Sequence, residues 1–319
     1  TYKSEAEAES LALKLMSKGG KLVYNFGTLP ALKNSDGLLT DTSDYLHLNA
    51  KQNRSQFVSP ENLPDMHELR ASEVVEFLDA HEGQGFFIKL AGPVSTGGGA
   101  GVWHCKGNDS RRLAVDAIAR RLEPDALLIA ETDCAPVNSW CAGVSILEDE
   151  IIFLGASKQV FYSPARQAGN EFSGEPPEAV KKLALEIAAR AQSGGYRGIA
   201  GFDIGELANK APVVFDLNFR PNSSTGLLLA GKGAMQKTGL PLARTFYLRH
   251  DGPLVELLDA VSHEADGGRI IPGSMFDALC YGKTLNDAAT RSCLDGWLLA
   301  EDSDEVASFA KVIAGRLAS

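Results

Sequence analysis

Two aspartates and an asparagine lie in two short apolar segments past the middle of the chain. Asp203 lies in GIAGFDIGEL, and Asp216 and Asn218 lie in APVVFDLNF. The apolar residues predict two buried strands, 199–205 and 212–219, and alternation places Asp216 and Asn218 on the same strand face. If these strands pair antiparallel, the two carboxylates face each other and repel unless a cation lies between them. Such oxygen ligands suit Mg²⁺, which predicts a metal site; a solvated acidic hairpin is the alternative, and buried strands disfavour it.

Arg220 follows directly, in DLNFRPNSSTG. A guanidinium beside two carboxylates either forms a simple ion pair with them or faces an anionic substrate group, such as a carboxylate or a phosphoryl group.

Lys89 lies in the apolar segment GFFIKLAG (85–92), a predicted strand, and the sequence STGGGAG (95–101) follows it closely. Glycines allow successive N–H groups to point at one phosphate, and a nearby lysine adds positive charge for the same anion. By itself, the pattern fits equally well a flexible hairpin with a lysine whose charged end reaches solvent.

Helices and strands alternate along the chain, which predicts a mixed α and β class. A helix is expected to begin near Ala50 and to run through Lys51, Arg54 and Phe57, after a turn-rich stretch at 28–49. A long polar loop with two basic residues, Lys158 and Arg166, is expected at 158–176. The other predicted helices are 4–18, 111–122, 177–191 and 304–317, and the other predicted strands are 21–27, 126–131, 144–147, 150–157 and 296–301.

The composition excludes several classes of protein. The formal net charge of −10 over 319 residues argues against a nucleic-acid or membrane-surface binder, and no apolar run approaches the length of a membrane span. The five cysteines and six histidines show no metal spacing, which indicates reduced thiols in a cytoplasmic protein. The acidic start is unlike a signal peptide, and because it lacks a Met we expect an N-terminal portion to precede it.

In order and spacing, these residues resemble the ATP-grasp superfamily, whose members join a carboxylate to an amine or a similar nucleophile. The resemblance covers roughly 50–226 and is most specific in GYRGIAGFDIG (195–205) with VVFDLNFRPNSSTG (213–226). The spacing is similar to that of D-alanine–D-alanine ligases, whereas the N-x-R ending is similar to that of carboxylases and purine-pathway members.

The resemblance implies an α+β ATP-grasp fold in which two α+β lobes enclose ATP. The small lobe would span about 51–130 and the large lobe about 131–226, with a hinge near 131–134. Residues 1–50 would be a short, truncated α/β remnant of the N-terminal domain. Residues 227–319 would be a C-terminal α/β extension that helps to select the acceptor substrate.

The resemblance also implies a role for each site residue. ATP would be bound by Lys51, Lys89, the loop residues Ser95, Thr96, Gly97, Gly98, Gly99 and Gly101, and the adenine-slot residues Ile129, Glu131, Thr132, Asp133, Cys134 and Leu217. Asp203, Asp216 and Asn218 would hold Mg²⁺. Arg220 would stabilise the oxyanion, and Lys158 and Arg166 would lie in a loop that covers the phosphoryl group.

Three positions depart from the family pattern. The family usually has Glu where this chain has Asp216. Asn138 or Ser139 occupies the stretch where a ribose-binding acid is expected. The D-alanine ligases have an arginine at the position of Gly201, so Arg220 would take over the oxyanion role, which argues against a D-alanine ligase.

The predicted reaction joins a small-molecule carboxylate to an amine through an acyl phosphate and releases ADP and phosphate. An amino acid or peptide ligase is the first choice, and the C-terminal region is faintly similar to peptide ligases of the pheganomycin type. The alternatives are a carboxylating or carbamoylating ATP-grasp enzyme and a non-catalytic ATP-binding module. We expect no nucleic-acid or membrane partner; a homodimer is compatible with the sequence, which does not determine the oligomeric state.

Overall fold

A computed structural model of the chain describes residues 5–22, 37–92, 101–208, 210–278 and 291–318. The chain divides into two compact units. The first consists of Thr1–Gly155, Phe161–Ala168 and Pro176–Asn222, and the second of Ala156–Val160, Gly169–Glu175 and Ser223–Ser319.

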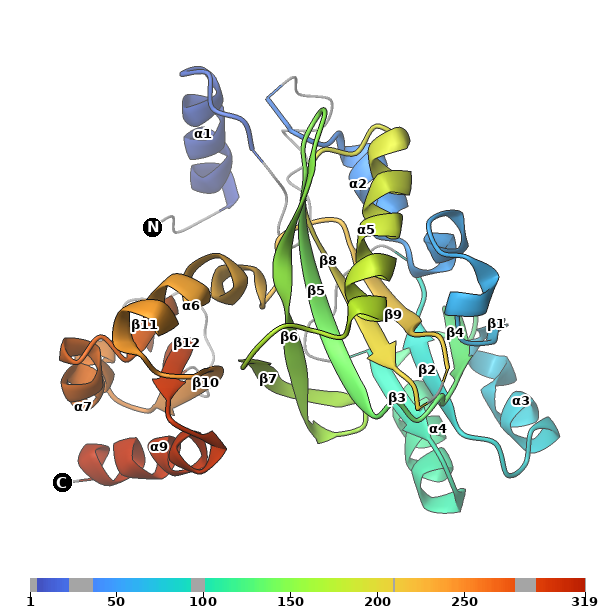
Figure 1. Cartoon of the computed structure of the whole chain (residues 1–319). Coiled ribbons are helices and arrows are strands. Elements are labelled where there is room, and N and C mark those ends of the chain that lie inside the picture. The colour runs from blue at the N-terminus through green and yellow to red at the C-terminus, as the bar shows by residue number, and fades with distance from the viewer. Residues whose placement is uncertain (1–4, 23–36, 93–100, 209, 279–290, 319) are drawn as a thin grey trace. The chain divides into compact units, whose positions relative to one another are not determined.

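The N-terminal part of the first unit is mostly helical (Figure 1). It contains α1 (Glu5–Met16), α2 (Thr42–Leu48) and two 3₁₀ helices, η2 (Lys51–Gln56) and η3 (Pro60–Asn62). The helix expected at 4–18 is confirmed. The prediction of a turn-rich stretch at 28–49 was wrong for α2, where Asp41 accepts a hydrogen bond from the Ser43 amide at 2.7 Å and caps the helix. The helix expected near Ala50 is the 3₁₀ helix η2. Of the strand expected at 21–27, residues 23–27 lie outside the described residues, and Leu22 forms an isolated bridge to Leu38.

A four-stranded antiparallel sheet follows, in the order β1-β4-β2-β3. Its strands are β1 (Met66–Arg70), β4 (Leu127–Thr132), β2 (Phe86–Leu90) and β3 (Val102–Cys105). The short turn η4 (Ala71–Glu73) leads into α3 (Val74–Ala80), and α3 and α4 (Asn108–Arg121) pack on the sheet through a core that includes Leu78, Phe86, Ile88, Ile118 and Leu128. The strands predicted at 85–92 and 126–131 and the helix predicted at 111–122 are confirmed.

The second sheet of the first unit is built on β5 (Asn138–Ile146), β8 (Gly198–Glu206) and β9 (Val213–Asn218). Helix α5 (Glu178–Ser193) packs along it and buries Val180, Ala184 and Ile187 (Figure 1). The helix predicted at 177–191 and both strands of the predicted aspartate hairpin are confirmed.

The stretch predicted as a long polar loop, 158–176, is instead mostly strand. Strand β6 (Ile151–Ser163) pairs with β5 and continues to Ser163, and β7 (Arg166–Phe172) returns beside it. Lys158 therefore lies within β6, and Arg166 opens β7. The composition of β7, RQAGNEF, has little strand preference, so pairing with neighbouring strands stabilises it rather than intrinsic propensity.

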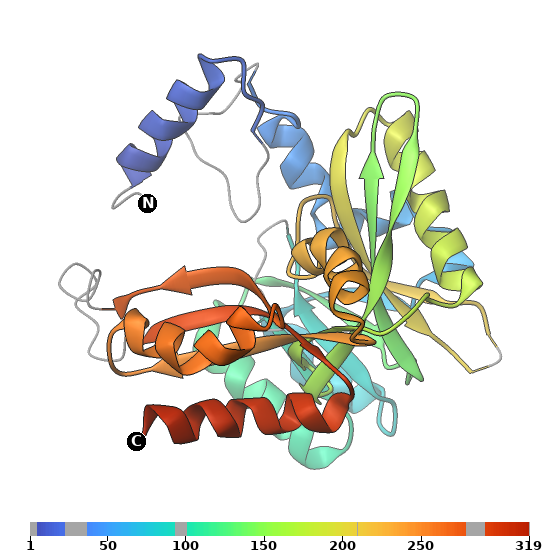
Figure 2. The ribbon, with the colours of Figure 1, turned by 60° about the vertical axis from the view of Figure 1, so that its left-hand side comes forward.

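In the second unit, β7 begins the strand order β7-β10-β12-β11, which is formed with β10 (Leu242–His250), β12 (Ser292–Ala300) and β11 (Ile270–Phe276). Helices α7 (Leu254–Asp266) and α9 (Ser303–Leu317) cover one face through Phe246, Leu298 and Phe309 (Figure 2). Helix α6 (Thr225–Thr238) packs through Leu227 against Ala243 and Leu299. The final strand and helix predicted from the sequence are confirmed. Among the described residues, no helix is both long and apolar enough to span a membrane.

Candidate active site

The two aspartates face each other across the β8–β9 pair. Asp203 and Asp216 are direct partners in the antiparallel register, so both side chains lie on the same face of the sheet. Directly opposed like charges destabilise a sheet unless a cation offsets them. The register then shifts, because Ile204 pairs with Val214 and Phe215 is skipped. Phe215 is therefore the extra residue of a β-bulge that immediately precedes Asp216.

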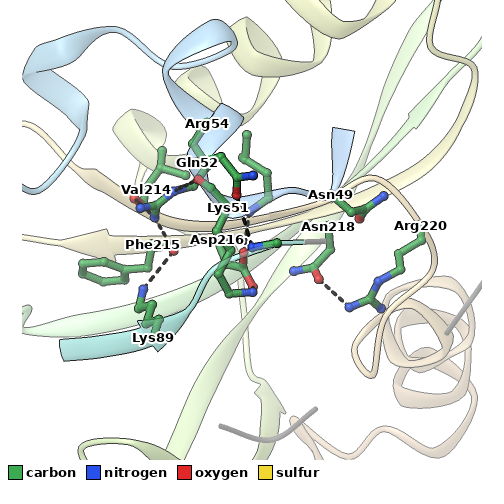
Figure 3. Close-up of polar contacts among 12 residues, drawn as sticks. Asn49, Lys51, Gln52, Arg54, Lys89, Val214, Phe215, Asp216, Asn218 and Arg220 are labelled. Atoms are coloured by element: carbon green, nitrogen blue, oxygen red, sulfur yellow. Dashed lines mark hydrogen bonds and ion pairs between the residues drawn. The ribbon is translucent and has the colours of Figure 1, made fainter. Parts of the chain in front are cut away.

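Asn218 lies two residues after Asp216 and shares its strand face. Its amide oxygen accepts a hydrogen bond from the Arg220 guanidinium at 2.6 Å, and Arg220 is 6% exposed (Figure 3). This contact places a permanent positive charge at the C-terminal end of β9, the strand that carries the predicted metal ligands Asp216 and Asn218. Leu217 lies on the opposite face and is buried.

Arg54 brings a second guanidinium to the same strand from η2. It donates from Nη1 to the backbone oxygens of Val214, at 3.2 Å, and of Phe215. Its Nη2 forms an ion pair with Glu131, and its Nε donates to the backbone oxygen of Lys51 at 3.2 Å. One side chain thus contacts η2, β4 and β9 (Figure 3 draws the β9 contacts).

Lys89 of β2 shares two partners with Arg54, Glu131 and the backbone oxygen of Phe215. Its Nζ forms an ion pair with Glu131 and donates to the Phe215 oxygen at 3.1 Å. Glu131 is 1% exposed and both of its carboxylate oxygens are occupied by cations. Burial lowers the pKa of the Lys89 ammonium, and the attraction of Glu131 offsets only part of this effect.

Lys51 supplies a further cation from the start of η2, with its Nζ 3.7 Å from Oδ2 of Asp216. Burial works to raise the pKa of the Asp216 carboxyl, yet four surrounding cations, led by Lys51 and Lys89, hold that pKa below its usual range. Asp216 is therefore ionised at neutral pH, and its side chain keeps 27% of its surface accessible. An ionised, accessible carboxylate can bind a cation.

A second polar cluster lies just beyond the end of β4. Asp133 accepts from Nε2 of His104 at 3.0 Å, and Nζ of Lys106 lies 3.6 Å away. Its other oxygen accepts from the Ala135 amide at 2.9 Å, and Ala135 has a left-handed φ of 46°. Burial works to raise the pKa of Asp133, but the hydrogen bond from His104 and that from the Ala135 amide outweigh it and lower the pKa.

The structure thus brings together Lys51, Lys89, Glu131, Asp203, Asp216, Asn218 and Arg220. The predicted adenine-slot residues Thr132, Asp133 and Cys134 follow Glu131 at the end of β4, where the half-buried Cys134 thiol contacts the Thr132 oxygen at 3.5 Å. Of the glycine loop, the backbone oxygen of Gly101 accepts from Leu90 at 3.0 Å. Ser95, Thr96, Gly97, Gly98 and Gly99 lie outside the described residues. The catalytic roles of Lys158 and Arg166, now placed on strands, remain predictions.

Arg54 is the site residue that the sequence analysis missed as a functional group. A signal for it exists, because residues i and i+3 of a 3₁₀ helix eclipse each other, and Arg54 follows Lys51 by three in η2. If Lys51 faces the site, Arg54 is therefore expected to lie on the same face of η2 and to point toward the site as well.

The cluster carries the charge balance of an anion site. It holds four basic side chains (Lys51, Arg54, Lys89 and Arg220) against three acids (Glu131, Asp203 and Asp216), which is a local excess of positive charge in a chain of net charge −10. Among the described residues, no group of three or more His, Cys, Asp and Glu is arranged to hold a metal ion, and the role of Asp203, Asp216 and Asn218 as metal ligands stays a prediction.

Two comparisons identify relatives of this architecture. The family model described as L-aspartate–L-methionine ligase, ATP-grasp, matches residues 64–218, a range that contains the polar cluster apart from η2 and Arg220. Solved structures of the same fold match nearly the whole chain.

N5-carboxyaminoimidazole synthetase from Staphylococcus aureus, complexed with ADP, is 14% identical, and the match covers 99% of this chain and 84% of that chain with a TM-score of 0.62. N5-carboxyaminoimidazole ribonucleotide synthetase from Thermus thermophilus is 12% identical, with 98% and 85% covered and a TM-score of 0.60. Phosphoribosylamine–glycine ligase from Thermotoga maritima is 13% identical, with 96% and 85% covered and a TM-score of 0.59. At these identities the likeness establishes the fold.

Proposed function

We propose that the chain is an ATP-grasp ligase that joins a carboxylate to an amine at the expense of ATP, releasing ADP and phosphate. The observation that carries the proposal is the pair of facing carboxylates, Asp203 and Asp216, with the cations Lys51 and Lys89 beside them. A carboxylate pair surrounded by lysines suits a polyanion that arrives with a divalent metal.

The residues present fit Mg²⁺ and ATP. Asp203 and Asp216 offer hard oxygen ligands on one sheet face, and Asn218 adds an amide oxygen from the same strand. When bound, Mg²⁺ would supply positive charge that offsets the negative charge of the phosphates. Lys51 and Lys89 would contact the phosphates, and the backbone of residues 132–134 would receive the adenine. Because Arg54 and Lys89 already occupy both oxygens of Glu131, we assign the adenine contact to this backbone rather than to that carboxylate.

The chemistry proceeds in two steps. A substrate carboxylate oxygen attacks the γ-phosphorus, the bond to the β–γ bridging oxygen breaks, and ADP leaves. Lys51 and Lys89 reduce the repulsion between the two anions. The amine nitrogen then attacks the acyl carbon of the acyl phosphate, phosphate departs and the nitrogen loses a proton. Arg220, held in place by Asn218, would stabilise the oxyanion of this second step.

Amino acids are the substrates that we favour, because the matching family model is named for the ligation of aspartate to methionine. A carboxylating reaction is the second candidate. It is supported by the Asn218–Arg220 contact in the N-x-R sequence and by the carboxyaminoimidazole synthetases among the structural relatives. In that case bicarbonate would replace the amino acid as the activated substrate.

The test is a product analysis with ATP, Mg²⁺ and either pooled amino acids or bicarbonate with candidate amines. We expect ADP and phosphate to appear only with an amino acid pair, and oxygen-18 from the substrate carboxylate to enter the phosphate. Asp216→Asn should fold and lose turnover, whereas the matched control Asp116→Asn, on the exposed face of α4, should keep it. AMP among the products, or unlabelled phosphate, would contradict this chemistry, and turnover that depends on bicarbonate would favour the second candidate.

A further inference from the structure

The Arg54 guanidinium is an unusual group to find in a protein interior. Arg54 is 1% exposed, and a buried guanidinium loses so much hydration that it is kept only where its donors are all used. Each of its three nitrogens has a partner. Nε binds the Lys51 oxygen, Nη1 binds two oxygens of β9, and Nη2 binds Glu131. One cation therefore holds three separate segments of the first unit.

The β9 contacts fall on the bulge. A bulge interrupts the hydrogen-bond ladder, so its backbone groups need partners from elsewhere. Arg54 bonds to the oxygens of Val214 and Phe215, and Lys89 bonds to the second of these as well. The Phe215 oxygen belongs to the peptide that joins Phe215 to Asp216. Its two cationic donors therefore fix the peptide plane from which the Asp216 side chain extends.

The remaining contacts reach the two lysines. The Nε bond ties Arg54 to the backbone of Lys51, whose Nζ lies 3.7 Å from Asp216. Glu131 links Arg54 to Lys89, because each cation takes one oxygen of the same carboxylate. Arg54 is thus linked, directly or through one shared partner, to Lys51, Lys89 and Asp216. Its own donors bind groups of the protein.

We propose that Arg54 is a positioning residue that sets the geometry of Asp216, and through it the contribution of magnesium to nucleotide binding. This inference rests on the proposed function, since it concerns the same nucleotide site. Because each nitrogen of Arg54 already has a partner within the protein, it would act through Asp216 rather than by direct contact with the metal or the phosphates. Its loss weakens metal-dependent binding by misplacing Asp216, while its positive charge contributes little.

The test measures ADP affinity by calorimetry on the full chain, once with Mg²⁺ and once with EDTA, and takes the ratio of the two dissociation constants. Wild type should bind ADP more tightly with Mg²⁺. Arg54→Lys keeps the charge but cannot reproduce a guanidinium fork, so it should reduce that ratio about tenfold or more. Arg111→Lys is the matched control. Arg111 also donates to three backbone oxygens, those of Leu78, His81 and Gln84, and its replacement should leave the ratio unchanged.

A second variant separates position from charge and covers the case in which Arg54→Lys fails to fold. Arg54→Met with Glu131→Gln removes one positive and one negative charge together, which buried ion pairs often tolerate. The net charge of the site is unchanged, so an effect of charge alone predicts a wild-type ratio, whereas positioning predicts a reduced one. A wild-type ratio in this double variant or in Arg54→Lys would overturn the inference, as would equal weakening with and without Mg²⁺. Absence of ADP binding by wild type would instead refute the proposed function.

Discussion

Glu131 and Asp133 lie two residues apart at the end of β4, and their carboxylates are neutralised in different ways. Glu131 is 1% exposed and is bound by Arg54 and Lys89, which come from η2 and β2. Asp133 accepts from His104 on the neighbouring strand β3 and from the amide of Ala135, only two residues away. Lys106, whose ammonium also lies near Asp133, has a side chain that is 63% exposed.

The difference separates two uses of a buried acid. The Glu131 cluster joins segments that are far apart in sequence, and its two cations also bind the bulge before Asp216. The Asp133 cluster is local and shapes one turn, at the left-handed Ala135. The first should therefore govern both global stability and the proposed phosphate binding, and the second should mainly govern the conformation of the turn that follows β4.

Removal of the Glu131 carboxylate should have the largest effect. Glu131→Ala leaves two cations buried without their anion, and breaking a buried ion pair in this way costs about 3–5 kcal/mol. Urea unfolding should show a loss of that size. Asp133→Ala should cost clearly less. Equal losses for the two variants would mean that the Glu131 cluster stabilises the fold no more than the local Asp133 cluster does.

Loss of a lysine from each cluster should separate their roles in binding. Lys89→Ala would remove the proposed charge-assisted contact to phosphate, worth about 1.5–3 kcal/mol, or one to two decades of ATP affinity. Lys106→Ala should leave that affinity unchanged, because the ammonium of Lys106 pairs with the turn acid Asp133 and not with Glu131 or Asp216. Calorimetric titration with ATP and Mg²⁺ measures both. Unchanged affinity in Lys89→Ala would return that residue to a structural role.

The Asp133 turn should show a smaller effect that a second change partly reverses. Asp133→Ala removes the acceptor of the Ala135 amide, and we expect a loss of about 1–2 kcal/mol in the free energy of unfolding. Adding Ala135→Gly should recover part of this loss, because glycine adopts a φ of 46° without strain. If adding Ala135→Gly recovers none of the loss in unfolding free energy, the conformation of the turn does not depend on the contact between Asp133 and the Ala135 amide.

The smallest expected effect is a pH dependence at the Asp133 turn. Its folded pKa is lowered, so its contribution to stability is present above the unfolded value of about 3.9 and is lost as pH falls through the lower folded value. The difference in unfolding free energy between wild type and Asp133→Asn should therefore be constant near neutral pH and vanish in acid. A difference that persists at low pH would point to a contact that does not need the ionised carboxylate.

The sequence predicted the aspartate hairpin because alternating strands must place Asp203 and Asp216 on defined faces. It did not predict the bulge at Phe215, since a bulge is a mismatch between two strands and neither strand alone encodes it. It also missed β7, whose residues RQAGNEF are ordered by their neighbours. The role of Arg54 escaped for a similar reason, because its partners on β4 and β9 lie 77 and 160 or more residues away.

The bulge at Phe215 makes the sheet less regular but provides a backbone oxygen that the candidate site uses. Deletion of Phe215 would restore an uninterrupted ladder, with Asp216 still opposite Asp203, and would give a more regular sheet. It would also remove the carbonyl that Arg54 and Lys89 share. A screen that selected only for resistance to heat could therefore accept this one-residue deletion, whereas a screen for nucleotide turnover should reject it.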